Sequence, residues 1–134
     1  MFERCLYFNL NAVARKVNAI WDQAFRELEL SPAHAYLLRV VLETPGLTQQ
    51  AIATELKLEK STVARFVDVL EKRGYLRRDR VGRERPVYPT DSAKAVRDEL
   101  ENRGDALYAQ MTRALGRESL VALVNDLRRT ANKL

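Results

Sequence analysis

Residues 47–76 read LTQQAIATELKLEKSTVARFVDVLEKRGYL, and this stretch predicts two helices. Thr48 is a favourable N-cap for a short helix over residues 49–56, whose inward side would consist of Ile52, Ala53 and Leu56. A second helix is predicted from Lys60 to Gly74, because its apolar residues recur at the spacing of one buried face: Val63, Phe66, Val67 and Leu70. Since only a short connection at residues 57–59 separates the two, the stretch predicts a helix–turn–helix.

The segment that follows the helix pair predicts a β-hairpin. Residues 75–80 and 84–89 indicate two short strands on either side of a turn at Val81-Gly82. A helix pair followed by an arginine-rich hairpin is typical of a winged helix–turn–helix, in which the second helix enters the major groove of DNA.

The net charge of +5 is concentrated in the same region. Residues 57–85 contain ten Lys or Arg and five Asp or Glu, whereas the charges of the remaining chain cancel. Such a local excess indicates a surface that binds a polyanion. The alternative is a chance cluster of charges on a solvated surface.

The outward side of the second helix offers side chains suited to DNA: Lys60, Ser61, Thr62, Arg65 and Asp68, with Glu59 just before them. Short hydroxyl side chains near a helix N-terminus let backbone amides approach phosphate. Arg65, one turn further on, could donate two hydrogen bonds to a guanine. The alternative is that these are the solvated residues of an ordinary amphipathic helix.

Helices are also predicted on the N-terminal side of this region. A stripe of apolar residues at helical spacing runs over residues 2–28 and includes Leu6, Leu10, Val13, Val17 and Trp21. Ser31-Pro32 predicts the start of a second helix, with Ser as N-cap and Pro at the first helical position. That helix would end before Thr44-Pro45-Gly46.

Beyond the hairpin the chain is again predicted to be helical. Thr90 or Asp91 would cap a long helix that reaches Leu115, and Gly116 would separate it from a final helix carrying Leu120, Leu123, Val124 and Leu127. The predicted fold is mainly α with a small β-hairpin wing: a winged helix–turn–helix core flanked by N- and C-terminal dimerisation helices.

The apolar stripes of the outer helices predict a homodimer. A monomeric winged helix does not need them, and they must be buried against something. We expect one domain over residues 1–134, with a helical dimerisation region at 1–30 and 91–134 and a DNA-binding lobe at 31–90. An entirely intramolecular helical cap is the alternative.

These residues resemble the MarR family of bacterial transcriptional regulators over essentially the whole chain, and most specifically over residues 47–76. The resemblance rests on Leu47-Thr48-Gln49-Gln50, on residues 58–65 and on residues 70–76. It implies a homodimeric regulator of transcription, expected to be a repressor and to be open to control by a small-molecule effector. Two recognition helices would read adjacent major grooves of a near-palindromic operator in double-stranded DNA, and wing arginines would enter the minor groove.

The resemblance also assigns site residues. Ser61, Thr62 and Arg65 match recognition-helix contact positions, and Arg83 matches the wing-tip arginine. With the basic and hydroxyl residues around them, the expected DNA-binding set is Thr48, Lys60, Ser61, Thr62, Arg65, Arg73, Arg80, Arg83 and Arg85.

The wing departs from the family pattern. Residues 89–93 read PTDSA where the family has Leu-Thr followed two residues later by Gly, and the hairpin is a few residues shorter. Val81 stands where the family places an acid before the wing arginine, so either Asp79 or Glu84 substitutes for it or the wing is looser than in the family. Arg85 is therefore as good a candidate as Arg83 for the wing contact.

Cys5, the single cysteine, lies near the start of the first helix. Some members of the family sense peroxides through a lone N-terminal cysteine hydrogen-bonded to tyrosines, so the resemblance makes Cys5 a candidate redox site. The comparable tyrosine places hold Asn9 and Ala19, and Tyr36 is displaced. An inert, partly buried thiol is therefore the favoured interpretation.

Four aromatic residues are candidates for an effector pocket between the dimer helices and the DNA-binding lobe: Trp21, Phe25, Tyr36 and Tyr108. Plain core packing is the alternative for each. His34, the only histidine, is interpreted as a polar residue in the first turn of its helix. One His and one Cys without a carboxylate cluster do not make a metal site.

Composition and motifs argue against several function classes. The chain shows no nucleophile–base pair, glycine-rich phosphate loop or metal-ligand spacing, so neither an enzyme nor a cofactor is expected. No apolar run approaches the ~18 residues of a membrane span, the first residues lack a signal-peptide layout, and one cysteine suits a reducing cytoplasm. The remaining alternative is a winged helix that binds another protein instead of DNA. Such a domain is not expected to keep an excess of basic residues on its recognition helix and wing.

Overall fold

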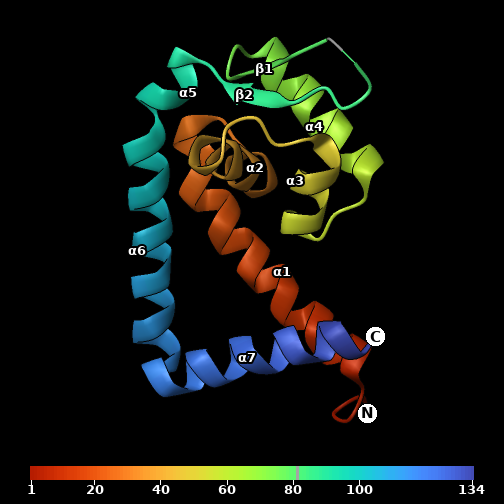
Figure 1. Ribbon diagram of the computed structural model, residues 1–134. Coiled ribbons are helices and arrows are strands. Elements are labelled where there is room, and N and C mark those ends of the chain that lie inside the picture. The colour runs from red at the N-terminus through yellow and green to blue at the C-terminus, as the bar shows by residue number, and fades with distance from the viewer. Residues whose placement is uncertain (81) are drawn as a thin grey trace. The chain divides into compact units, whose positions relative to one another are not determined.

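The computed structural model describes residues 1–80 and 82–134, which fall into two compact units, residues 1–101 and 102–134 (Figure 1). The first unit contains the whole of the predicted DNA-binding lobe, and the second is helical. Within the described residues, no helix combines the length and the apolar character needed to cross a membrane.

The helices and strands follow the predicted order. The chain forms α1 (Leu6–Phe25), the 3₁₀ turn η1 (Arg26–Leu28), α2 (Pro32–Glu43), α3 (Gln49–Leu56), α4 (Lys60–Lys72), β1 (Leu76–Arg78), β2 (Val87–Pro89), α5 (Asp91–Ala95), α6 (Arg97–Leu115) and α7 (Arg117–Lys133). Helix α6 runs from the first unit into the second. The mainly helical fold with a small β-hairpin is confirmed.

Three of the helix starts are fixed by hydroxyl caps. Ser31 Oγ accepts from the backbone N–H of His34, Thr48 Oγ1 from that of Ala51, and Thr90 Oγ1 from that of Ala93. The predicted caps Ser31 and Thr48 are confirmed. Of the two candidates at the third helix start, Thr90 is the cap.

The core of the first unit forms around α2, which packs against α1, α3, α4 and β2 (Figure 1). Phe25 from α1, Leu37 and Leu38 from α2, and Ile52 from α3 are fully buried. Val63, Val67 and Leu70 of α4 are also fully buried, whereas Phe66 is half-buried against the ring of His34. The buried face of α4 is therefore close to the predicted one and positions the opposite face outward.

The turn between α3 and α4 is set by a left-handed residue. Lys57 has φ 56° and ψ 44°, and the next amide, that of Leu58, donates to the carbonyl of Ala53 at 3.0 Å. This pattern closes the end of α3 and redirects the chain into α4 within a few residues.

The wing is shorter than predicted. β1 and β2 pair antiparallel in the register Leu76↔Pro89, Arg77↔Tyr88 and Arg78↔Val87. The strand expected from residue 84 begins only at Val87, because Arg85 has a positive φ of 44° and Pro86 has no N–H to donate to the ladder. Of the predicted turn, Gly82 has a φ of 81°, and Val81 lies outside the described residues.

The long helix predicted after the wing is interrupted once. Val96, with φ −102° and ψ 4°, separates α5 from α6, and its N–H bonds to the carbonyl of Ala93 in a tighter turn. Further along, Gly116 has a φ of 83° and precedes α7, as its predicted role of separator requires.

Candidate nucleic-acid interface

The N-terminus of α4 has no side-chain cap, unlike those of α2, α3 and α5. Glu59 holds the N-cap position in extended conformation, but its side chain accepts nothing from the first turn. The free amides of a helix start carry partial positive charge and favour phosphate. Lys60 and Ser61 are exposed beside them. This end of α4 is therefore open to an external anion.

Thr62 and Arg65 follow one turn further along α4. Nη2 of Arg65 lies 3.5 Å from Oγ1 of Thr62, at the outer limit of a hydrogen bond. The guanidinium is exposed and forms no ion pair within the described residues. Arg65 is therefore available to donate to an acceptor outside the chain.

The wing tip comes together with the helix–turn–helix. Thr48, Gln49 and Gln50 at the start of α3, Lys60 at the start of α4, and Arg83 and Glu84 of the wing line a polar hollow of about 220 Å³. Arg85 is exposed in the same loop. The structure thus gathers Thr48, Lys60 and Arg83 from the predicted set at one place.

A largely buried arginine that the sequence argument did not single out connects the wing to α4. The Arg78 side chain on β1 is only 10% exposed. Its guanidinium pairs with Asp68 and Glu71 of α4 and donates to Oε1 of Gln49 on α3 at 3.2 Å. The amide of Arg78 donates to Oε2 of Glu71 at 3.1 Å, and Arg80 pairs with Oε1 of Glu71 at 3.0 Å. We call Gln49, Asp68, Glu71, Arg78 and Arg80 the Arg78 cluster.

The electrostatics of the Arg78 cluster favour its charged form. The hydrogen bond from Arg78 lowers the pKa of Glu71, and its charge and that of Arg80 act in the same direction. Burial acts to lower the pKa of Arg78, but the hydrogen bonds to Glu71 and Asp68 outweigh it and the pKa is raised. Two acids three residues apart on α4, followed by an arginine in the next strand, were the sequence signal for this cluster.

Arg73, another member of the predicted DNA-binding set, is exposed but is bound by other groups of the first unit. Its guanidinium donates to the carbonyl of Glu29 and lies 5.4 Å from the ring centroid of Tyr75. His34 packs against the middle of α4, with 4.5 Å between its ring centroid and that of Phe66. Burial, followed by the charge of Arg73, lowers the pKa of His34.

Three of the four candidate effector aromatics meet in the first unit. Trp21 Nε1 donates to the hydroxyl of Tyr36 at 2.8 Å, and the rings of Phe25 and Tyr36 meet edge to face. Phe25 is fully buried and so belongs to the core. Tyr108 lies in the second unit and is exposed.

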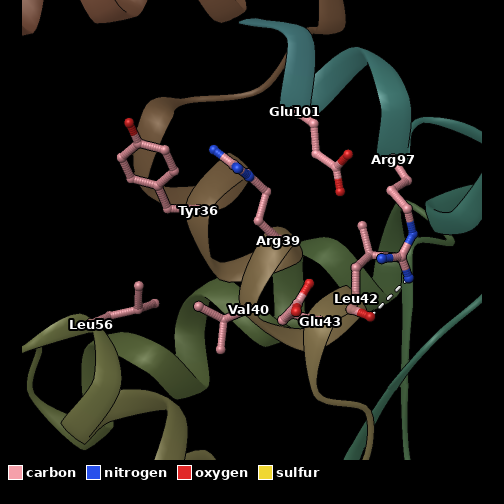
Figure 2. A pocket seen from close by; sticks show the side chains of 8 residues that line it. All are labelled: Tyr36, Arg39, Val40, Leu42, Glu43, Leu56, Arg97 and Glu101. Carbon is pink, nitrogen blue, oxygen red and sulfur yellow. Dashed lines mark hydrogen bonds between the residues drawn. The ribbon is translucent and has the colours of Figure 1, made fainter. Parts of the chain in front are cut away.

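Beside Tyr36 lies a cavity of about 350 Å³, which we call the Arg39 pocket (Figure 2). Helix α2 supplies most of its wall, the last residue of α3 one side and the start of α6 another. The lining residues are Tyr36, Arg39, Val40, Leu42, Glu43, Leu56, Arg97 and Glu101. The sequence argument found only Tyr36, because the other residues are brought together by the fold.

Cys5 lies half-buried just before α1, and its carbonyl accepts from Nδ2 of Asn9 at 2.8 Å. The same amide nitrogen donates to the carbonyls of Phe2 and Glu3. Asn9 thus closes the first turn of the chain. Among residues 1–80 and 82–134, no group of three or more His, Cys, Asp or Glu is placed to hold a metal ion.

Comparison with known proteins identifies the helix–turn–helix region. The sequence model of the MarR family matches residues 28–85. The uncharacterized HTH-type transcriptional regulator YybA of Bacillus subtilis is 27% identical over 100 residues, which cover 72% of this chain and 66% of YybA. The match therefore spans just under two thirds of the length of that relative.

Solved structures share the fold over nearly the whole chain. The transcriptional repressor CouR bound to a 23-mer DNA duplex has a TM-score of 0.87 at 25% identity, covering 97% of this chain and 94% of that one. CouR bound to p-coumaroyl-CoA has a TM-score of 0.89 at 24% identity, covering 99% and 96%. The fold is thus that of a winged helix–turn–helix regulator.

Proposed function

We propose that this chain, whose residues 28–85 match the sequence model of the MarR family, is a sequence-specific repressor that binds double-stranded DNA as a homodimer. One observation carries the proposal. The start of α4 and the wing tip present exposed cationic and hydroxyl side chains, whereas Arg73, Arg78 and Arg80 near them bind to groups of the protein.

Each element of the interface has a distinct role in this proposal. The uncapped start of α4, with Lys60 and Ser61, would bind phosphate and fix the register. Arg65 would donate to a base edge in the major groove, and Arg83 or Arg85 would enter the minor groove. CouR, whose fold this chain shares, is described as bound to a DNA duplex, which supports the same use of the fold here.

The dimer is supported by apolar side chains that stay exposed in a single chain. On α1, Leu6 and Val13 are each more than half exposed, at 61% and 53%. On α7, Leu123, Val124 and Leu127 are also exposed. Burying one such side chain contributes ~1.5–3 kcal/mol, so a second copy would gain much by covering both stripes. We assign dimerisation to residues 1–30 and 91–134 and DNA binding to residues 31–90.

Selection of bound sites from random duplex DNA by the purified protein tests the proposal. We expect a two-fold symmetric consensus with half-sites ~10 bp apart, and an affinity that falls about a thousandfold between ~50 and ~200 mM salt. A consensus without a dyad, or light scattering at the 15.4 kDa of one chain, would contradict the dimer. Elution from heparin at low salt with no selected site would contradict DNA binding and favour a protein-docking module.

Control by a small molecule is the second part of the proposal. The Arg39 pocket supplies a volume of about 350 Å³ beside Tyr36, one of the expected effector residues. It lies in the same unit as the helix–turn–helix, so an occupant could act on the DNA-binding elements through direct packing.

A further inference from the structure

Val69 is an apolar side chain on the outer surface of α4. It is 42% exposed, whereas the other two valines and the leucine of this helix are fully buried. A β-branched residue on the exposed side of a helix adds no core packing and lowers the helix propensity slightly. The packing of the first unit therefore does not account for a valine at this position.

Val69 shares a side of α4 with two residues of the candidate interface. Thr62, Arg65 and Val69 are spaced at i, i+3 and i+7, which aligns them along one side of a helix. Nη2 of Arg65 lies 3.5 Å from Oγ1 of Thr62, so these two side chains meet on that side. The same spacing carries base contacts in the recognition helix of homeodomains. Val69 therefore continues the surface of Thr62 and Arg65 by one more turn.

The charged side chains next to Val69 are bound within the protein. Asp68 pairs with Arg78 of the wing. Arg73, one turn beyond Val69, donates to the backbone carbonyl of the residue after η1. The apolar surface of Val69 thus lies between two charged groups that already have partners in the chain, and it is itself left to solvent.

An isopropyl group can recognise one feature of the major groove. It neither donates nor accepts a hydrogen bond, and the apolar group that base edges present there is the C5-methyl of thymine. The step from Arg65 to Val69 spans ~6 Å along the helix axis, which is about two base-pair steps of DNA. We propose that Val69 packs against the C5-methyl of a thymine about two base pairs from the base that Arg65 contacts. The inference rests on the proposed function and names one determinant of sequence choice within it.

Removal of a single methyl group from the DNA tests this contact. In the selected operator, each thymine of a half-site is replaced in turn by deoxyuridine, which lacks only the C5-methyl. We expect the change to weaken binding about fourfold at a thymine about two base pairs from the position that Arg65→Ala relaxes, since one buried methyl group is lost. Replacement in both half-sites should weaken binding about fifteenfold, because the two contacts are separate.

Variants of Val69 show whether this side chain is the one that contacts the methyl group. Val69→Ser should bind the thymine and deoxyuridine operators equally at this position, whereas Val69→Ile keeps an apolar surface and should retain the fourfold preference. Lys72→Ala, exposed on the same helix, is the control and should change the affinity for both operators by the same factor. A preference for thymine that persists in Val69→Ser, or no effect of deoxyuridine at this position in the wild type, would overturn the proposal.

A second selection from random duplex DNA separates this inference from the proposed function. Val69→Ser should select the wild-type consensus with the preference for thymine lost at one position of each half-site, and its urea midpoint should equal that of the wild type because the side chain is exposed. A consensus identical to that of the wild type would contradict the contact at Val69 and uphold sequence-specific DNA binding. A wild-type protein that selects no site at low salt would contradict the proposed function and this inference with it.

Discussion

The two halves of α4 differ in whether their polar side chains have partners within the protein. In the first half, Lys60, Ser61 and Arg65 are exposed, and the helix start has no cap. In the second half, Asp68 and Glu71 are paired with Arg78 of the wing, and Arg73 is bound to the carbonyl of Glu29. The start of this helix thus carries charged and hydroxyl groups without strong partners in the protein, whereas Asp68, Glu71 and Arg73 near its end bind to other parts of the chain.

The difference shows how one helix can offer its first half to DNA while its second half is fixed to the rest of the protein. A side chain that is to contact DNA must have no strong partner inside the protein, because exchanging one partner for another gains little. A side chain that holds the helix in place needs such a partner. The Arg78 cluster fixes α4 relative to the wing, and it also neutralises two acids that would otherwise repel phosphate.

The largest expected effect is the loss of the Arg78 cluster. Arg78→Ala leaves Asp68 and Glu71 without their main partner, and because both carboxylates still reach water, the loss of these charge-assisted hydrogen bonds should cost about 2 kcal/mol of unfolding free energy. Urea unfolding should show that loss, and DNA affinity should fall as well. Arg77→Ala, on the exposed side of the same strand, is the control and should cost no more than about 1 kcal/mol, since it loses only an exposed ion pair with Asp79 and the stacking on Tyr88.

A triple substitution sharpens this test. Arg78→Met with Asp68→Asn and Glu71→Gln removes these three charges at once and leaves only Arg80, which is 68% exposed and solvated, without its partner Glu71. We expect it to recover part of the stability lost in Arg78→Ala. A triple variant as unstable as the single one would mean that Arg78 acts through packing and not through its charge.

The next effect concerns the open half of α4. Arg65→Ala should leave the urea midpoint unchanged but cost ~1–3 kcal/mol of binding to the selected operator, with the preference relaxed at one base pair per half-site. Lys72→Ala, exposed at the other end of the same helix, should reduce affinity far less. An Arg65→Ala loss that is equal for every sequence would make Arg65 a phosphate contact.

The contrast between the halves also explains what the sequence could predict. Apolar spacing located α2, α3 and α4 to within a few residues, and the caps Ser31 and Thr48 followed from local chemistry. The exposed face of α4 follows from the same spacing. These features depend on neighbours in the chain, which a sequence displays directly.

The features that the sequence did not predict depend on residues far apart in the chain. Arg73 was expected to face DNA, and whether it reaches DNA stays a prediction; its guanidinium is engaged by a carbonyl 44 residues away. Arg78 needed Gln49, Asp68 and Glu71 to be brought together, and the Arg39 pocket needed α2, α3 and α6. The wing strands were predicted too long, because the positive φ of Arg85 shows only in three dimensions.

A smaller effect is expected at the cap of α3, which lies beside the open half of α4. Thr48→Ala removes the acceptor for the Ala51 amide and should lower the unfolding free energy by about 1 kcal/mol. Thr48→Ser keeps the oxygen and should retain most of the stability. Thr54→Ala, on the exposed side of the same helix, is the matched control, because its hydroxyl only donates to the carbonyl of Gln50.

The smallest expected effect is a pH dependence of the folding stability, which arises from His34 packed against α4. His34 has a half-buried ring whose Nε2 has no partner, and Arg73 on α4 is the nearby charged group. Because its pKa is lowered from 6.5 in the folded chain, the unfolded chain binds the proton more readily. Stability from this group is therefore complete above about pH 6.5 and declines as the pH falls from 6.5 toward the lowered pKa.

Urea midpoints measured from pH 7.5 down to 5.5 check this expectation. His34 is the only histidine, so no other side chain with an ordinary pKa titrates across that interval. The wild type should lose stability below pH 6.5, and His34→Gln should show a flat midpoint. Arg73→Gln removes the nearby cation, so its decline should be weaker than that of the wild type while burial of the ring still leaves a part of it. A wild-type midpoint that rises as the pH falls would mean that a charged His34 finds a partner in the folded chain, contrary to the packing of its ring against Phe66.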